Sequence, residues 1–118
     1  EKHMIAEVIW KRLKLRMPLG IDAAIIYGIK DYAGDLTFRH LRDSANPYNT
    51  RVRLGLPPSP VCSPTVDSLL AVLTPTQAGY LYYVLDPELG NRHHFSRNFS
   101  EHQNYARKLV KAEKAAQR

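Results

Sequence analysis

The stretch Asn46-Pro47-Tyr48-Asn49-Thr50, continued by Gly55-Leu56-Pro57-Pro58-Ser59-Pro60 and Ser63-Pro64, decides how the middle of this chain folds. Most of the chain's eight prolines lie in it. Proline fixes φ at about −65° and has no backbone N–H, so the segment is neither a helix interior nor a central strand. Its apolar side chains are ones that a solvated linker would lack: Tyr48, Val52, Leu54, Leu56, Val61 and Cys62. We therefore predict an ordered loop over residues 46–64 that these side chains anchor and that lines a cleft.

Length and composition indicate one folded domain. The chain has 118 residues, of which 44% are hydrophobic, and this is enough for a single core over residues 1–118. Lys and Arg outnumber Asp and Glu by 17 to 11, which gives a net charge of +6. Much of the excess lies at residues 11–16 and 107–118, where it fits solvated helix faces. No RNA-binding signature accompanies the charge, so we predict no nucleic-acid partner.

The cysteine content and the chain ends set further limits. Cys62 is the only cysteine, which excludes a disulfide within the chain, and we expect it to be a small buried thiol. No run of 18 apolar residues and no signal peptide is present. Because the first residue is Glu1 and not methionine, we expect that an N-terminal part has been removed.

The periodicity predicts an α+β fold with several short helices around a β-hairpin. Helices are expected over residues 2–16, 38–43 and 65–73, with a last helix from about Ser100; residues 23–29 form a short apolar segment. Asp35 or Thr37 is the expected cap of the second helix, with Phe38 and Leu41 facing inward. Ser63 or Thr65 caps the third, whose apolar face is Val66, Leu69, Leu70 and Leu73. Strands at 80–85 and 92–97 flank a turn at 86–91.

Familiar cofactor and nucleophile motifs are missing. His93 and His94 are adjacent on a predicted strand and point to opposite faces, so they do not easily bind one metal ion together. The chain contains no Gly-x-Ser-x-Gly elbow, no glycine-rich nucleotide loop and no phosphate loop for pyridoxal phosphate. We predict neither a metal nor a cofactor.

Two places carry polar groups suited to a binding site. Tyr48, Asn49 and Thr50 present a phenol, an amide and a hydroxyl, which are the groups that line sugar and acetamido sites. The alternative is an Asx-type turn with Tyr48 packed in the core. Asp22 follows a turn at Gly20 and is either a site acid or a cap that bonds backbone amides.

With these residues identified, the chain resembles the YceG-like (MltG) family of endolytic murein transglycosylases over nearly its whole length. The most specific part is Tyr48-Asn49-Thr50 followed by Gly55-Leu56-Pro57-Pro58 in this order. The other matching pieces are Lys11-Arg12-Leu13, Met17-x-Leu19-x-x-Asp22, Ile26-Tyr27-Gly28, Pro60, Pro64, Tyr80–Val84, His93-x-Phe95 and Ser100-Glu101-His102.

The resemblance implies a lyase that cuts peptidoglycan glycan strands without adding water. One glutamic acid with a raised pKa protonates the oxygen between N-acetylmuramic acid (MurNAc) and N-acetylglucosamine (GlcNAc), and the muramoyl 6-hydroxyl closes a 1,6-anhydro ring. The resemblance also implies a location in the bacterial cell envelope, on the extracytoplasmic or periplasmic face of the inner membrane. It makes cell-wall synthases candidate partners and places any membrane anchor in a missing N-terminal part.

The family's catalytic glutamate falls upstream of Glu1, so the resemblance places no catalytic residue in this chain and implies that the chain alone is inactive. It assigns substrate-binding or supporting roles to Asp22, Tyr27, Tyr48, Asn49, Thr50 and Pro57. The chain departs from the family pattern at Gly20-Ile21-Asp22-Ala23 and at Arg51. These departures keep a catalytically degenerate glycan-binding or scaffold domain open as an alternative. Aminodeoxychorismate lyase, a further alternative, is disfavoured because no pyridoxal-phosphate motif is present.

Overall fold

The structure is a computed structural model that describes residues 1–90 and 92–116. Position 91 of the expected turn and the last two residues of the basic C-terminal segment lie outside the described residues. The chain divides into two compact units. We call residues 1–11 and 65–118 the hairpin unit, and residues 12–64 the loop unit. The expectation that residues 1–118 form a single domain stays a prediction.

The elements confirm the predicted α+β class. In chain order they are α1 (Lys2–Lys14), α2 (Asp22–Tyr27), α3 (Phe38–Arg42), α4 (Val66–Leu73), β1 (Tyr82–Leu85), the 3-10 helix η1 (Pro87–Leu89), β2 (His93–Ser96) and α5 (Phe99–Ala116). The apolar segment at 23–29 is therefore mostly helical. Within the described residues, no helix has both the length and the apolar character that a bilayer crossing requires.

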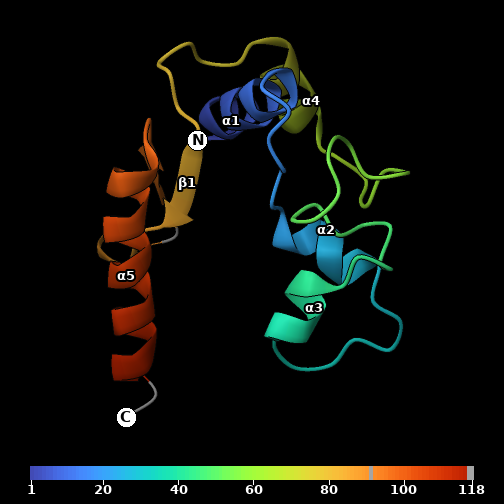
Figure 1. The fold of residues 1–118 in the computed structure, drawn as a ribbon. Helices are drawn as coiled ribbons and strands as arrows, with labels where there is room; N and C mark the ends of the chain where they lie inside the picture. Colours follow the sequence, from blue (N-terminus) through green and yellow to red (C-terminus); the bar gives the residue numbers. More distant parts are fainter. Residues whose placement is uncertain (91, 117–118) are drawn as a thin grey trace. The chain divides into compact units, whose positions relative to one another are not determined.

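In the hairpin unit, β1 and β2 pair antiparallel, with Tyr82 opposite Ser96 and Leu85 opposite His93. Helix α5 lies along this hairpin (Figure 1). The two adjacent histidines confirm the predicted alternation of faces. His94 stacks on Tyr105 of α5 with 3.4 Å between ring centroids, whereas His93 contacts Tyr83 and Phe95.

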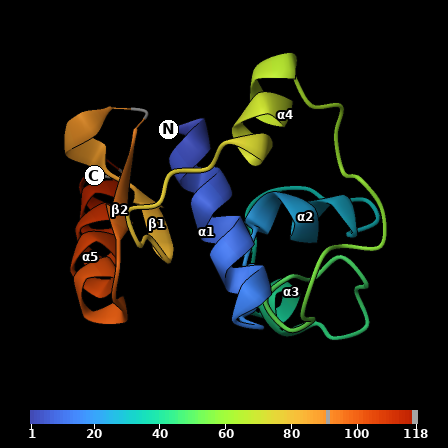
Figure 2. The ribbon, with the colours of Figure 1, turned by 90° about the horizontal axis from the view of Figure 1, so that it is seen from above.

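Helices α1 and α4 lie side by side in this unit (Figures 1 and 2). Ala6, Val8 and Ala71 are buried there, and the Trp10 indole N–H donates to the Val72 carbonyl oxygen at 2.9 Å. Thr65, one of the two expected caps, caps α4 by accepting from the Ser68 N–H.

The four residues expected to form the apolar face of α4 do share one side of the helix, but that side is exposed. Its four members are between 53% and 77% exposed: Val66, Leu69, Leu70 and Leu73. The buried residue of α4 is Ala71, which the helical spacing places on the other side of the helix from that stripe.

In the loop unit, the buried apolar residues are Leu19, which precedes α2, and Ala24 and Ile25 of α2. Thr37 caps α3, because its hydroxyl accepts from the His40 N–H while His40 Nδ1 accepts from the Thr37 N–H. The prediction that Phe38 faces inward is wrong, since its side chain is 76% exposed. Helix α3 buries none of its five residues and is held instead through its C-terminal carbonyls.

Between Asp43 and Thr65 the described chain forms turns and bends with no helix or strand. The predicted apolar anchors are largely wrong, because Val52, Leu54, Leu56 and Cys62 are exposed. Side-chain amides and hydroxyls bonded to backbone groups order the first part of the loop instead. That the loop lines a cleft stays a prediction.

Candidate functional site

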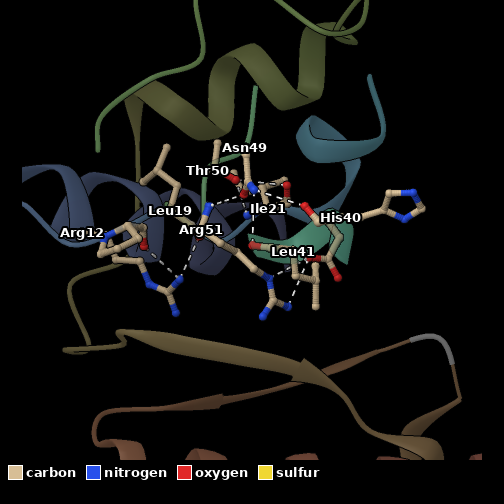
Figure 3. A network of polar contacts seen from close by, with 10 residues as sticks. Arg12, Leu19, Ile21, His40, Leu41, Asn49, Thr50 and Arg51 are labelled. Carbon is tan, nitrogen blue, oxygen red and sulfur yellow. Dashed lines mark hydrogen bonds and ion pairs between the residues drawn. The ribbon is translucent and has the colours of Figure 1, made fainter. Parts of the chain in front are cut away.

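Asn49 joins the loop to α3 and has no exposed surface. Its Nδ2 group lies within hydrogen-bond distance of three carbonyl oxygens, those of His40 (3.2 Å), Leu41 (3.2 Å) and Asp43 (2.9 Å), as Figure 3 shows in part. Its Oδ1 accepts from the Arg51 N–H at 3.1 Å. The last carbonyls of a helix lack hydrogen-bond donors within the helix, and the Asn49 amide provides a donor for those of α3. All of its polar atoms are engaged within the protein.

Thr50 joins the loop to the start of α2. Its hydroxyl accepts from the Ile21 N–H at 2.8 Å and donates to the Ile21 carbonyl at 3.1 Å (Figure 3). Its own carbonyl accepts from the Gly20 N–H at 3.0 Å. Ile21 is the N-cap of α2 and provides no side-chain cap, so Thr50 stabilises a helix start that the local sequence leaves uncapped. Thr50 is 2% exposed.

Asn46 makes the third polar attachment, although the sequence analysis did not include it among the site residues. Its Nδ2 donates to the Ile25 carbonyl at 3.0 Å. Its Oδ1 accepts from the Tyr48 N–H at 3.0 Å, which forms the Asx turn that the sequence offered as an alternative. A Cβ added at Gly28 would lie 2.0 Å from Asn46 Oδ1 and 2.9 Å from Tyr48 Cβ. Asparagine before proline was the signal that could have identified this turn.

Tyr27 and Tyr48 form an aromatic pair that reaches the surface. Their ring centroids are 4.8 Å apart at an interplanar angle of 63°, and Tyr27 is 53% exposed. The Tyr48 hydroxyl lies 2.6 Å from Ser59 Oγ, in the Pro57–Pro60 part of the loop. Pro57 itself is partly buried. This pairing holds the tyrosine ring between α2 and the proline segment, so the stacking surface has a fixed orientation.

Asp22 and Arg51 form an ion pair on the same unit. Both Nε and Nη2 of Arg51 donate to Asp22 Oδ1, at 3.3 and 3.2 Å. The two side chains are about half exposed, so the pair stabilises the fold by at most about 1 kcal/mol. Asp22 also lies in the first turn of α2, where a carboxylate complements the helix dipole. Arg51 departs from the family pattern, but its ion-pair partner, Asp22, is a residue that matches that pattern.

The structure brings all six predicted site residues into the loop unit and separates them by exposure. Asn49 and Thr50 are buried and bond only to the protein, whereas Asp22, Tyr27 and Tyr48 have accessible surface. This division suits a site in which the buried pair fixes the loop and the exposed groups meet a ligand. Substrate contact by any of the six stays a prediction.

The sequence analysis also missed Glu7 of the hairpin unit, a carboxylate that is 3% exposed. It accepts from the Thr76 hydroxyl (2.7 Å) and from the backbone N–H groups of Ala78 (3.2 Å) and Gly79 (2.7 Å). Burial acts to raise the pKa of Glu7, but these hydrogen bonds and the Lys11 ammonium outweigh it and hold the pKa below its usual 4.5. Glu7 is therefore an ionised structural group at neutral pH.

The histidines of the hairpin are paired with carboxylates rather than grouped. His93 bonds Glu1 through its backbone N–H and its ring, and His94 Nε2 lies 3.1 Å from Glu101 Oε1. Among residues 1–90 and 92–116, no three histidine, cysteine or acidic side chains are grouped closely enough to hold a metal ion.

The chain is a member of the YceG-like family, whose model matches residues 1–108.

Two curated relatives are named endolytic murein transglycosylase. The one from Bacillus subtilis is 29% identical over 110 residues, which cover 93% of this chain and 30% of the relative. The one from Streptococcus pneumoniae strain D39 is 33% identical over 116 residues, which cover 88% of this chain and 21% of the relative. Among solved structures, a YceG-like protein from Listeria monocytogenes matches with a TM-score of 0.78 and 31% identity, over 86% of this chain and 33% of that chain. The chain thus spans a third or less of the length of these proteins.

Proposed function

We propose that the protein carrying this chain is a peptidoglycan lytic endotransglycosylase, which cleaves the MurNAc–GlcNAc bond and leaves a 1,6-anhydroMurNAc end. The observation that carries the proposal is the family match over residues 1–108, together with relatives named endolytic murein transglycosylase. The loop unit agrees with it, because an aromatic pair that reaches the surface and a half-exposed carboxylate both suit a neutral, hydroxyl-rich strand.

In this proposal the chain supplies the glycan-binding part of the site. Tyr27 and Tyr48 stack against a sugar ring, and the half-exposed Asp22 carboxylate accepts a sugar hydroxyl. Asn49 and Thr50 hold Tyr48 in place from beneath, and Pro57 stiffens the far side of the loop.

The proposed chemistry needs one carboxyl group and no added water. A glutamic acid, which we place outside this chain, protonates the glycosidic oxygen so that the GlcNAc leaving group departs. The muramoyl 6-hydroxyl then attacks C1 and returns its proton to the same carboxylate, which restores the acid. The bond to the leaving oxygen breaks and the bond from O6 to C1 forms, so the bonds and the proton balance.

We place the protein at the bacterial cell envelope, on the extracytoplasmic or periplasmic face of the inner membrane, with cell-wall synthases as candidate partners. Residues 1–118 are proposed to form a single domain, which contributes the glycan-binding part of a catalytic site whose glutamic acid lies outside them.

The proposal is tested by incubating the complete protein with purified sacculi and analysing the soluble products. Release of 1,6-anhydromuropeptides supports it. Sedimentation of the protein with sacculi and no soluble fragments would instead favour the degenerate glycan-binding domain, for which the Arg51–Asp22 pair is the motivating observation, because it occupies a carboxylate of the site.

A further inference from the structure

A cavity of about 220 Å³ in the hairpin unit has no part in the function proposed above. It is lined by Glu7, Trp10, Lys11, Pro75, Thr76 and Gln77. At about 30 Å³ per water molecule, its volume corresponds to roughly seven waters, which suits one or two small amino-acid residues rather than a long strand.

Trp10 gives this cavity a fixed apolar wall. Its indole N–H donates to the Val72 carbonyl at 2.9 Å, which anchors the ring against the C-terminal turn of α4. Half of the side chain nevertheless stays exposed. Pro75 lines the same cavity, so a ligand would meet two rigid apolar surfaces.

Glu7 shapes the cavity without offering a free charge. Its two carboxylate oxygens accept from Thr76, Ala78 and Gly79, so it fixes the backbone of residues 76–79. Because these contacts and burial enclose the carboxylate, it is not available to a ligand.

One cation, Lys11, lines the cavity, and a second, Arg97, bonds the carbonyl of Ala78, next to the lining residues 75–77. Lys11 Nζ is 4.0 Å from Glu7 Oε2, and its side chain is 41% exposed. Arg97 donates from Nε to the Ala78 carbonyl at 2.7 Å and stacks on Tyr80. Both flank Gly79, since a Cβ added there would lie 3.7 Å from Lys11 Nζ and 3.5 Å from Arg97 Nε. Two cations against one enclosed carboxylate leave this edge positive.

We propose that this cavity binds the peptide stem of a muramoyl unit, with a small apolar side chain against Trp10 and Pro75 and a stem carboxylate at Lys11 and Arg97. The charge decides between peptide and sugar, because a neutral sugar has nothing to pair with two cations, whereas the stem carries carboxylates beside methyl groups. This inference rests on the proposed function, which it deepens by naming the part of the substrate that the hairpin unit reads.

Trp10 is the only tryptophan, so its fluorescence reports on the cavity directly. The test titrates the chain with N-acetylmuramoyl-L-alanyl-D-glutamate and, separately, with neutral chitotetraose. We expect a saturable fluorescence change with the first and none with the second. Lys11→Gln should weaken the apparent affinity at least fivefold. Lys14→Gln, on the same helix and outside the cavity, should leave it unchanged.

Equal responses to both ligands would mean a neutral sugar platform and would overturn the inference, as would no saturable response or equal loss in the two lysine variants. Circular dichroism before and after each substitution shows that the variants keep the same fold. The two proposals fail separately. Cleavage of sacculi by the complete protein without a response to the muramoyl dipeptide would contradict only the stem-binding site. A response to the dipeptide without cleavage of sacculi would contradict only the transglycosylase activity.

Discussion

At Asn49 a single side-chain amide joins the proline-rich loop to the end of α3, and no part of it is exposed to solvent. The neighbouring Asn46 and Thr50 act in the same way on α2. Buried backbone carbonyls that lose their donors retain a desolvation penalty, which makes these short polar side chains more important to the loop than its exposed leucines.

Asn49→Ala should therefore destabilise the chain by about 2 kcal/mol, because it removes a buried amide and leaves part-buried carbonyls at the end of α3 without that donor. Urea unfolding followed by circular dichroism measures this. Asn104→Ala, at an exposed position of α5, is the control and should change stability by less than about 0.5 kcal/mol. Similar small changes in both variants would contradict the role given to Asn49.

The contribution of Glu7 to stability should depend on pH. Its pKa is lower in the folded chain than in the unfolded one, so its contribution is present above about pH 4.5 and is lost as the pH falls through the folded pKa. Glu7→Gln should cost about 2 kcal/mol at pH 7, with the difference from the parent shrinking toward pH 3. Unfolding curves at both pH values measure this, with Glu113→Gln on α5 as control. A deficit that stays constant with pH would refute the assignment.

At the scale of elements, helix α2 and the loop approach each other through Gly28. Its φ of −84° suits any residue, so glycine is needed there for space alone. Gly28→Ala should destabilise the chain by about 2 kcal/mol or more through contact with Asn46 and Tyr48.

The matched control is Gly34→Ala, where a Cβ meets nothing within 4 Å and only the positive φ of 83° opposes it. We expect a loss of about 1 kcal/mol there. Thermal unfolding compares the two, and a Gly28→Ala variant no less stable than Gly34→Ala would show that the loop does not pack on α2 as described.

The sequence was enough to predict most elements, because caps and periodicity are local. Thr37, Thr65 and the aromatic alternation of the hairpin specify where two helices and two strands form. It was not enough to predict which side of a helix is covered. The stripe from Val66 to Leu73 has ideal helical spacing, yet the residue of α4 that is buried is Ala71, on the other side of the helix. That depends on long-range contacts that periodicity does not contain.

The candidate site was predictable in part for the same reason. Their polar groups singled out Tyr48-Asn49-Thr50 and Asp22, and the resemblance added Tyr27 and Pro57; contact of these residues with a substrate stays a prediction. Asn49 and Thr50 proved to bond carbonyls at the ends of other elements, at Leu41 and Ile21 among them. The sequence did not predict that Ser59 bonds Tyr48 or that Arg51 pairs with Asp22; the structure shows both contacts. Residue type indicates what a side chain can bond, whereas the fold decides whether that bond is internal.

At the scale of the whole molecule, residues 12–64 form one compact unit inserted between the two segments of the other. The insertion separates two tasks in our account. The loop unit presents the tyrosine pair to the sugar, and the hairpin unit holds the cavity beside Trp10 for the stem. The sequence analysis predicted a single domain because 118 residues suit one core.

The central claim is cleavage without water, and isotope labelling tests it most directly. The complete protein is incubated with sacculi in water enriched in oxygen-18, and the new muramoyl ends are examined by mass spectrometry. The account predicts 1,6-anhydro ends that carry no oxygen-18, because the oxygen joined to C1 is the substrate's own O6. Reducing ends that carry one oxygen-18 atom at C1 would show hydrolysis and would contradict it.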